Sequence, residues 1–289
     1  MTVKSVGVVG CGLMGHGIVQ VAAQAGCKVI ALEADAGALE KGLSRIKKSL
    51  AKLVEKEKID QAAADKAFAN ITGSGDLADL KDCDLVVEAI VENLDVKNEL
   101  FAKLGKLCKP STIFASNTSS FSIGTMGEAS GRPERMVGLH FFNPVQLMKL
   151  VEVVRAEKTS DEVFAEAKAF GEACGKVPVA AKDTPGFVVN RLLVPYLAEA
   201  IRMVERGDAT PADVDAGMTL GCGYPMGPFT LLDYVGLDTT LFILKGWHDE
   251  HPGEALFDIP KLLTDKVEAG KLGRKTGEGF FKWEGDKRA

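Results

Sequence analysis

The stretch Val3-Lys-Ser-Val-Gly-Val-Val-Gly10-Cys-Gly12-Leu-Met-Gly15 decides the fold of this chain. A short apolar run ends in three glycines spaced Gly-x-Gly-x-x-Gly, and apolar residues then recur at helical spacing as far as Gly26. A second strand-like run, residues 28–32, ends at Glu33. The order of strand, glycine turn, helix, strand and acid predicts a Rossmann-type dinucleotide-binding unit.

The glycines of this turn have separate physical roles. Gly10 permits the tight turn, Gly12 lets the backbone approach a pyrophosphate, and Gly15 lets the helix pack close to the strand. The N-terminus of the following helix faces the phosphates, because its free amides and its dipole favour negative charge. Leu13 and Met14 complete the turn, so we include them in the predicted cofactor site.

The acid at the end of the second strand predicts which dinucleotide binds. Glu33 is placed to accept hydrogen bonds from the adenosine ribose hydroxyls, and its carboxylate would repel a 2′-phosphate. Residues 34–38 contain no Arg or Lys that could bind such a phosphate. We therefore predict NAD rather than NADP, with Asp35 as an alternative to Glu33 for this role.

The remaining elements predict an α/β fold with two domains. Strand-like and helical runs alternate up to residue 181, and residues 84–90 (DLVVEAI) form an apolar run typical of a parallel strand buried on both faces. About eight strands would form a mostly parallel sheet. From residue 187 the pattern is helical, apart from a weak strand near 279–283, and Pro195 should kink the first helix or shift its cap. We predict a Rossmann-type NAD-binding domain at residues 1–184 and a smaller all-helical domain, for substrate binding and dimerisation, at 185–289.

Composition excludes several classes of function. With 46% hydrophobic residues, 26% charged residues and a net charge of −5, we expect no nucleic acid and no membrane partner. The six cysteines are scattered without a Cys-x-x-Cys pair, which favours free thiols, a reducing compartment and no metal site. No leader-like segment opens the chain and no apolar run approaches the ~20 residues of a membrane span. We expect a cytoplasmic protein.

Residues 138–144 (GLHFFNP) carry a candidate catalytic group. His140 closes a strand-like run, and Glu152 lies in the next such run. A histidine at a strand end with a carboxylate behind it is suited to general acid–base chemistry. The alternative is a core histidine bonded to a neighbour, and these residues alone leave both interpretations open.

Three further features have a structural and a functional interpretation. The polar run 116–120 (SNTSS) follows a strand at the predicted ligand-binding edge, but such residues also form turns and cap helices. The basic helix at 41–58 is either a solvated face or a landing site for an anionic substrate tail. Asn190, inside an apolar helix, is either satisfied locally or points into the cleft between the domains.

Together these motifs resemble the L-3-hydroxyacyl-CoA dehydrogenase family, most closely its 3-hydroxybutyryl-CoA dehydrogenase members, over about residues 3–284. The similarity rests on ordered blocks: GCGLMG (10–15), DLVVEAIVENLDVKNELF (84–101), IFASNTSS (113–120), GLHFFNPV (138–145), KLVEVV (149–154), KDTPGFVVNRLLVPYLAEA (182–200), GYPMGPFTLLDYVGLD (223–238) and GRKTGEGFF (273–281). The family usually has Asp in place of Glu33, and a different loop around residues 145–148.

The resemblance implies roles for individual residues. His140 would be the catalytic base and Glu152 the acid that orients it, while Ser119 and Asn190 would bond the substrate near the reacting oxygen. Further residues match the family's cofactor and CoA-tail positions. The predicted cofactor site is Gly10, Gly12, Leu13, Met14, Gly15, Glu33, Glu92, Lys97, Asn117, Ser119, Asn143 and Lys275, and the additional substrate contacts are Ser49 and Lys56.

The reaction that the resemblance implies is NAD-dependent interconversion of a (3S)-3-hydroxyacyl-CoA and a 3-oxoacyl-CoA, with short chains as the expected substrates. The partners would be an acyl-CoA thioester and, through the C-terminal domain, a second copy of the chain. Apolar residues beyond the need of one helix face support the dimer: Leu192, Leu193, Val194, Tyr196, Leu197 and Ile201. The alternatives are a sugar-acid dehydrogenase of the L-gulonate type on the same fold, and a non-catalytic NAD-binding protein.

Overall fold

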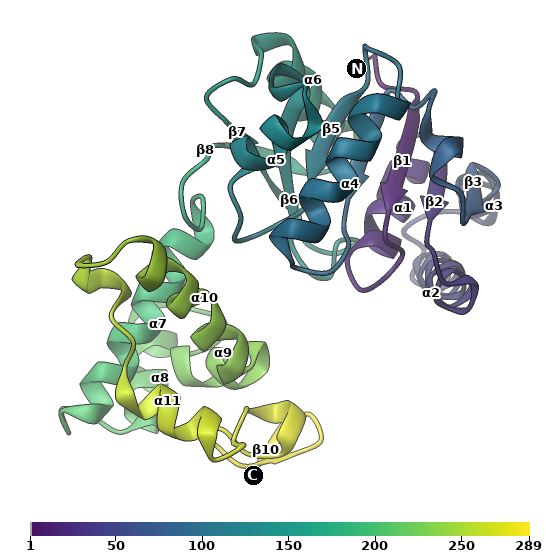
Figure 1. The fold of residues 1–289 in the computed structure, drawn as a ribbon. Helices are drawn as coiled ribbons and strands as arrows, with labels where there is room; N and C mark the ends of the chain where they lie inside the picture. The colour runs from purple at the N-terminus through teal and green to yellow at the C-terminus, as the bar shows by residue number, and fades with distance from the viewer. Residues whose placement is uncertain (1) are drawn as a thin grey trace. The chain divides into compact units, whose positions relative to one another are not determined.

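The computed structural model describes residues 2–289, and the chain divides into two compact units, Met1–Phe187 and Val188–Ala289. The first unit is built on an eight-stranded sheet in the order β3-β2-β1-β4-β5-β6-β7-β8 (Figure 1). The strands are β1 (Ser5–Val9), β2 (Lys28–Leu32), β3 (Ile71–Ser74), β4 (Leu85–Glu88), β5 (Ile113–Ser116), β6 (Met136–Phe141), β7 (Leu150–Arg155) and β8 (Val177–Lys182). Neighbouring strands are parallel except β6 and β7, which confirms the predicted mostly parallel sheet.

Helices cover both faces of this sheet, which explains why the central strands are apolar almost throughout. One face packs on α1 (Gly15–Gln24), α2 (Ala36–Glu55), α3 (Gln61–Ala69) and α6 (Asp161–Ala173). The other packs on α4 (Leu94–Leu107) and α5 (Ile123–Ser130) (Figure 1). The helix starts follow their sequence signals: Asp35, Asn93 and Ser160 each accept a hydrogen bond from an amide in the first turn of their helix.

The second unit is mainly helical, as the sequence predicts. It contains α7 (Val189–Glu205), α8 (Pro211–Cys222), α9 (Pro228–Val235), α10 (Leu237–Glu250) and α11 (Lys261–Glu268). Gly236, with a φ of +102°, separates α9 from α10. Pro195 lies inside α7, which is continuous from Val189 to Glu205, so the helix does not begin or end at this proline. The weak strand expected near 279–283 is displaced: β9 (Trp283–Glu284) pairs with an unpredicted partner, β10 (Lys287–Arg288).

The apolar side chains of α7 serve mostly the unit's own core, which corrects the argument made for them as a subunit interface. Val194, Leu197 and Ile201 are buried with Phe229 and Trp247. Leu192 alone among the six apolar positions is strongly exposed, at 71%. The helix therefore needs more apolar surface than one face provides because several helices of its own unit pack around it.

Other global features can be stated for the described chain. None of the helices within residues 2–289 combines the length and apolarity needed to cross a bilayer. In the same residues, no three His, Cys, Asp or Glu side chains gather into a group that could hold a metal ion. All six cysteines are free thiols, as the sequence predicts, and all but Cys222 are buried.

Candidate active site

The glycine turn follows β1 and lies at the point where the strand order reverses, between β1 and β4. A Cβ atom on Gly15 would lie 1.7 Å from the carbonyl oxygen of Gly10, and one on Gly10 would lie 2.5 Å from that of Ala89. Gly12 has open space around the same position. The backbone is therefore tightly packed at Gly10 and Gly15 and open at Gly12, which fits the approach of a pyrophosphate to the backbone at Gly12.

A cleft of about 500 Å³ extends from this turn along the ends of β1, β2 and β4. Gly10, Gly12, Leu13, Met14 and Glu33 are among its lining residues. This cleft brings together the predicted cofactor residues of the glycine turn and the acid of β2, at the edge where open α/β sheets bind ligands.

Glu33 is tied to the turn that it faces. Its Oε2 accepts a hydrogen bond of 3.0 Å from the backbone amide of Cys11. Burial, together with the charge of Glu33, raises the pKa of the Cys11 thiol to about 11, so this thiol is protonated at neutral pH. Asp35, the alternative ribose ligand, caps α2 through the amide of Ala38, which gives it a structural task of its own.

Glu92 and Lys97 lie at the neighbouring end of β4, and a third residue joins them. The Lys97 Nζ is 2.5 Å from Glu88 Oε1 and 3.1 Å from Glu92 Oε2. Lys97 and Glu88 are only 1% and 0% exposed, whereas Glu92 is partly open to solvent. Glu88 was not among the predicted site residues, because residues 84–90 form an apolar run, although an acid ending such a strand at the ligand edge was a usable signal.

The polar run at the end of β5 reaches across to β6. The Asn117 Oδ1 accepts a 2.9 Å hydrogen bond from the amide of Phe141, the residue after His140. The Ser119 hydroxyl lies 3.3 Å from that of Ser120. The cap of α5 is Ser122, so residues 116–120 are not its N-cap. At the carboxyl edge of the sheet, Asn117 therefore contacts the strand that carries His140.

His140 and Glu152 face each other on the antiparallel strands β6 and β7, where they are register partners. The His140 Nδ1 is 2.6 Å from Glu152 Oε2, and the two residues are 7% and 0% exposed. The rings of Phe142 and Phe187 lie 4.5 and 5.7 Å from the imidazole, centroid to centroid. The two rings and the burial of the pair reduce screening by water, which strengthens the electrostatic interaction between His140 and Glu152.

The loop that joins β6 to β7 is anchored on its inner side. Asn143, exposed, precedes Pro144 through a cis peptide bond. Val145 is buried against Gly17 of α1. The buried Lys176 donates hydrogen bonds to the carbonyls of Val145 and Met148, at 2.5 and 2.8 Å, and burial lowers the pKa of this ammonium. The backbone after His140 is therefore held, although the loop lies on the surface.

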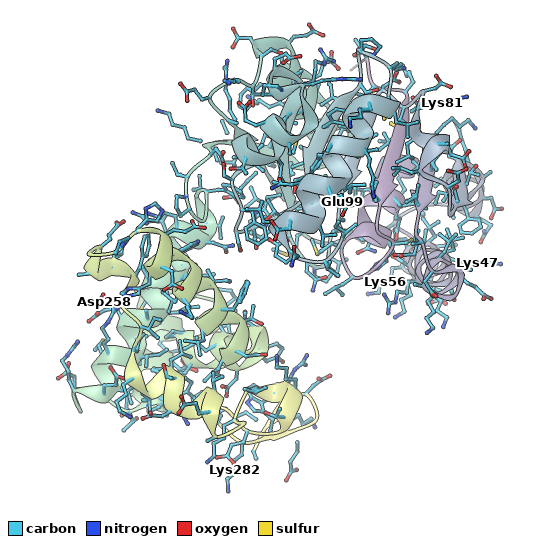
Figure 2. The ribbon with its side chains drawn as sticks, in the orientation of Figure 1. Lys47, Lys56, Lys81, Glu99, Asp258 and Lys282 are labelled. Carbon is cyan, nitrogen blue, oxygen red and sulfur yellow. The ribbon has the colours of Figure 1, made fainter. Side chains whose placement is uncertain are left out.

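The remaining predicted site residues lie on α2 and in the second unit. Ser49 is half-buried on α2, and Lys56 is an exposed residue at the C-terminal cap of that helix. Figure 2 labels Lys47 on α2 and Lys56 at its C-terminal cap, on opposite sides of the helix. In the second unit, Asn190 lies in the first turn of α7, and Lys275 pairs with Asp238 at 2.6 Å.

Comparison with known proteins places the chain in one family. The sequence profile of the 3-hydroxyacyl-CoA dehydrogenase NAD binding domain matches residues 5–184, and that of the C-terminal domain of the same enzymes matches residues 186–283. The mitochondrial hydroxyacyl-coenzyme A dehydrogenase of Rattus norvegicus is 51% identical over 98% of this chain and 92% of its own length. A probable 3-hydroxybutyryl-CoA dehydrogenase of Deinococcus radiodurans is 49% identical over 96% of this chain and 99% of its own.

A solved structure agrees with the sequence comparisons. The crystal structure of (S)-3-hydroxybutyryl-CoA dehydrogenase from Ralstonia eutropha superposes with a TM-score of 0.95, at 40% identity, and the alignment covers 98% of this chain and 100% of that one. Both domain profiles, full-length relatives and this structure point the same way. The chain therefore belongs to the 3-hydroxyacyl-CoA dehydrogenase family, and the dinucleotide that its first domain binds is NAD.

Proposed function

We propose that this chain interconverts short-chain (3S)-3-hydroxyacyl-CoA and 3-oxoacyl-CoA, with His140 and Glu152 as the acid–base pair. The observation that carries the proposal is the 2.6 Å contact between His140 Nδ1 and Glu152 Oε2. It lies at the carboxyl edge of the sheet that also carries the glycine turn. A histidine oriented by a buried carboxylate, in the same sheet as a dinucleotide site, is suited to the oxidation of a hydroxyl.

In the oxidative direction, His140 takes the proton of the 3-hydroxyl group. NAD⁺, which Gly10, Gly12 and Glu33 would hold in the cleft, would supply the acceptor for the hydride from C3 as the C3–O bond becomes a carbonyl. Because Nδ1 is engaged by Glu152, Nε2 is the nitrogen that exchanges the proton with substrate. Glu152 keeps the ring in this tautomer and stabilises the imidazolium that forms. In the reductive direction the protonated His140 returns the proton to the new alkoxide.

The oxygen of the substrate needs hydrogen-bond donors as its charge develops. Ser119 supplies one such donor, since its turn is linked through Asn117 to the residue after His140. The family resemblance assigns the same task to Asn190. Proton transfer by His140, as a general acid–base, contributes on the order of 10²–10⁴ in rate.

The C-terminal part of α2 is suited to the anionic tail of CoA. Lys56 is exposed at its cap, and Lys47 is exposed within the helix. Ser49 adds a hydroxyl on the same helix. A phosphate-bearing substrate would be attracted to these lysines, whereas a free hydroxy acid gains little from them.

We further propose that residues 1–184 form the NAD-binding domain and that residues 185–289 contribute to substrate binding and to a homodimer. Support for the dimer comes from exposed apolar residues of the second unit: Leu192, Leu220 and Phe242 are 71%, 88% and 58% exposed. Sedimentation as a monomer at micromolar concentration would refute the dimer.

Free thiols favour a reducing compartment such as the cytoplasm.

Steady-state kinetics with a substrate series test the proposed function. Acetoacetyl-CoA and longer 3-oxoacyl-CoA thioesters, up to sixteen carbons, are compared at fixed NADH, with NADPH in parallel. The expected result is saturation by CoA thioesters, the highest kcat/KM at four carbons, and a preference for NADH. A free sugar acid that saturates the enzyme in preference to any CoA thioester would favour the L-gulonate-type activity instead.

A further inference from the structure

Five residues form a closed ring of polar interactions: four lie at or just after the ends of β4 and β5, and Lys97 lies on α4. Glu88 Oε2 accepts a 2.5 Å hydrogen bond from the Ser116 hydroxyl, which in turn accepts one of 3.1 Å from the amide of Thr118. The Thr118 hydroxyl donates to Glu92 Oε1. Glu92 Oε2 and Glu88 Oε1 both contact the Lys97 ammonium, which closes the ring.

Four members of this ring are nearly inaccessible to solvent: Glu88, Lys97, Ser116 and Thr118 are between 0% and 2% exposed. Burying an ion pair costs desolvation free energy that its own attraction does not always offset. An apolar filling of the same space would serve the core at least as well. A complete polar network here therefore suggests a task beyond stability.

The ring fixes the turn that carries Ser119. On one side of Ser119, the Thr118 amide is bound by Ser116. On the other side, the amides of Ser120 and Phe121 are bound by the Thr118 hydroxyl, at 3.2 and 3.1 Å. The ring thus holds backbone groups on both sides of Ser119.

The ring includes a predicted cofactor contact and is linked to the strand that carries His140. Glu92 is a predicted cofactor contact and a member of the ring. Asn117 lies between the ring members Ser116 and Thr118, and its side chain holds the amide next to His140. One network therefore connects a cofactor contact with a substrate contact.

We infer that the Glu88–Lys97–Thr118 ring is a positioning device that sets Ser119 for the substrate oxygen and Glu92 for the cofactor. Thr118 is its key positioning residue, because its amide and its hydroxyl are both part of the ring. This inference rests on the proposed function, in which Ser119 bonds the substrate. It adds Glu88, Ser116 and Thr118 as residues that act on the reaction without touching the reacting atoms.

A double-mutant cycle separates positioning from a purely structural role. Thr118→Val keeps the shape of the side chain and removes the hydroxyl. We expect it to lower kcat with acetoacetyl-CoA about tenfold or more, a size typical of coupled neighbours. In a Ser119→Ala background the same change should cost less than about threefold, because the group being positioned is gone. Thr118→Ser, which retains the hydroxyl, should restore most of the loss.

Thr112→Val is the matched control. Thr112 is also fully buried and precedes β5 at its other end, where its hydroxyl donates to the carbonyl of Cys83 at 2.7 Å. This variant should lose stability to urea as Thr118→Val does, with kcat unchanged. Ser116→Ala breaks the ring at a different bond, and we expect it to couple to Ser119 in the same way.

NADH titration, followed by the fluorescence of the nucleotide, provides a readout that does not depend on turnover. Thr118→Val should weaken NADH binding about threefold or more, because Glu92 loses one of its two partners and keeps only Lys97, whereas Thr112→Val should not. Absence of turnover by the unmodified enzyme would refute the proposed function and leave this binding result to decide the inference. Equal kcat losses from Thr118→Val with and without Ser119, or NADH affinities that match the control, would overturn the inference.

Discussion

Replacing Glu152 by Gln probes the electrostatic part of the proposed chemistry, the stabilisation of a protonated His140. The substitution keeps the volume of a fully buried side chain and removes its charge. The proton that His140 takes up in the oxidative direction then makes an imidazolium without its counter-charge at 2.6 Å. Gln can still accept a hydrogen bond at Nδ1, so the loss is mainly electrostatic.

The size of that loss follows from the geometry. Two unit charges about 4 Å apart attract with about 4 kcal/mol at an effective dielectric constant of about 20, and a charge-assisted hydrogen bond contributes about 1.5–3 kcal/mol. A loss of about 3–4 kcal/mol in the transition state lowers kcat by about two to three powers of ten. The apolar rings of Phe142 and Phe187 keep water from screening the new imidazolium.

The assay is steady-state oxidation of NADH with saturating acetoacetyl-CoA, alongside urea unfolding and NADH titration to verify the fold. Glu172→Gln, an exposed position on α6, is the control that removes a carboxylate without touching the pair. A Glu152→Gln enzyme that keeps kcat within about threefold of the original would refute the electrostatic argument, because that corresponds to less than about 1 kcal/mol.

Three other changes have expected outcomes. Gly138→Ala places a Cβ 2.6 Å from that of Val154, so it should lower the free energy of unfolding in urea by about 1–3 kcal/mol, and an unchanged value would mean that β6 and β7 can separate freely. Asp84→Asn removes a carboxylate whose pKa is lowered to about 2. Burial alone would raise this pKa, but hydrogen bonds from Lys109 and from the amides of Lys4 and Ser5 lower it by more. Its depressed pKa stabilises the fold above pH about 4, so the variant should lose about 1–2 kcal/mol at pH 7, allowing for partial exposure, and this difference should vanish as the pH falls towards 2. Glu33→Ala should raise the KM for NADH about tenfold and reduce the preference over NADPH, and an unchanged preference would remove Glu33 from cofactor selection.

Much of the fold followed from local patterns in the sequence. The glycine turn, the alternation of apolar strands with amphipathic helices, and the change of pattern near residue 186 each depend on neighbours a few residues away. The missed hairpin partner β10 is a two-residue strand whose pairing depends on a neighbour rather than on its own pattern. The apolar excess on α7 was misread because burial by α9 and α10 is a tertiary effect.

The candidate site divides in the same way. His140 and Glu152 stood out because each is a polar residue in an apolar strand, and the antiparallel pairing that opposes them also follows from a short connection. The position of Glu88 at a strand end was visible in the sequence, but its partners were not, because Lys97 and Ser116 come from a helix and a strand that only the folded sheet brings together. The hydrogen bond from Phe141 to Asn117 likewise links residues 24 positions apart.

Turnover of His140→Gln with acetoacetyl-CoA and NADH tests the central claim most directly, because the proposed chemistry needs a group at this position that exchanges a proton. The account predicts a fall in kcat of about 10²–10⁴, with NADH binding and the urea midpoint close to those of the unmodified enzyme. Near-normal turnover by this variant would contradict the account and leave the 2.6 Å contact with Glu152 as a feature of the core alone.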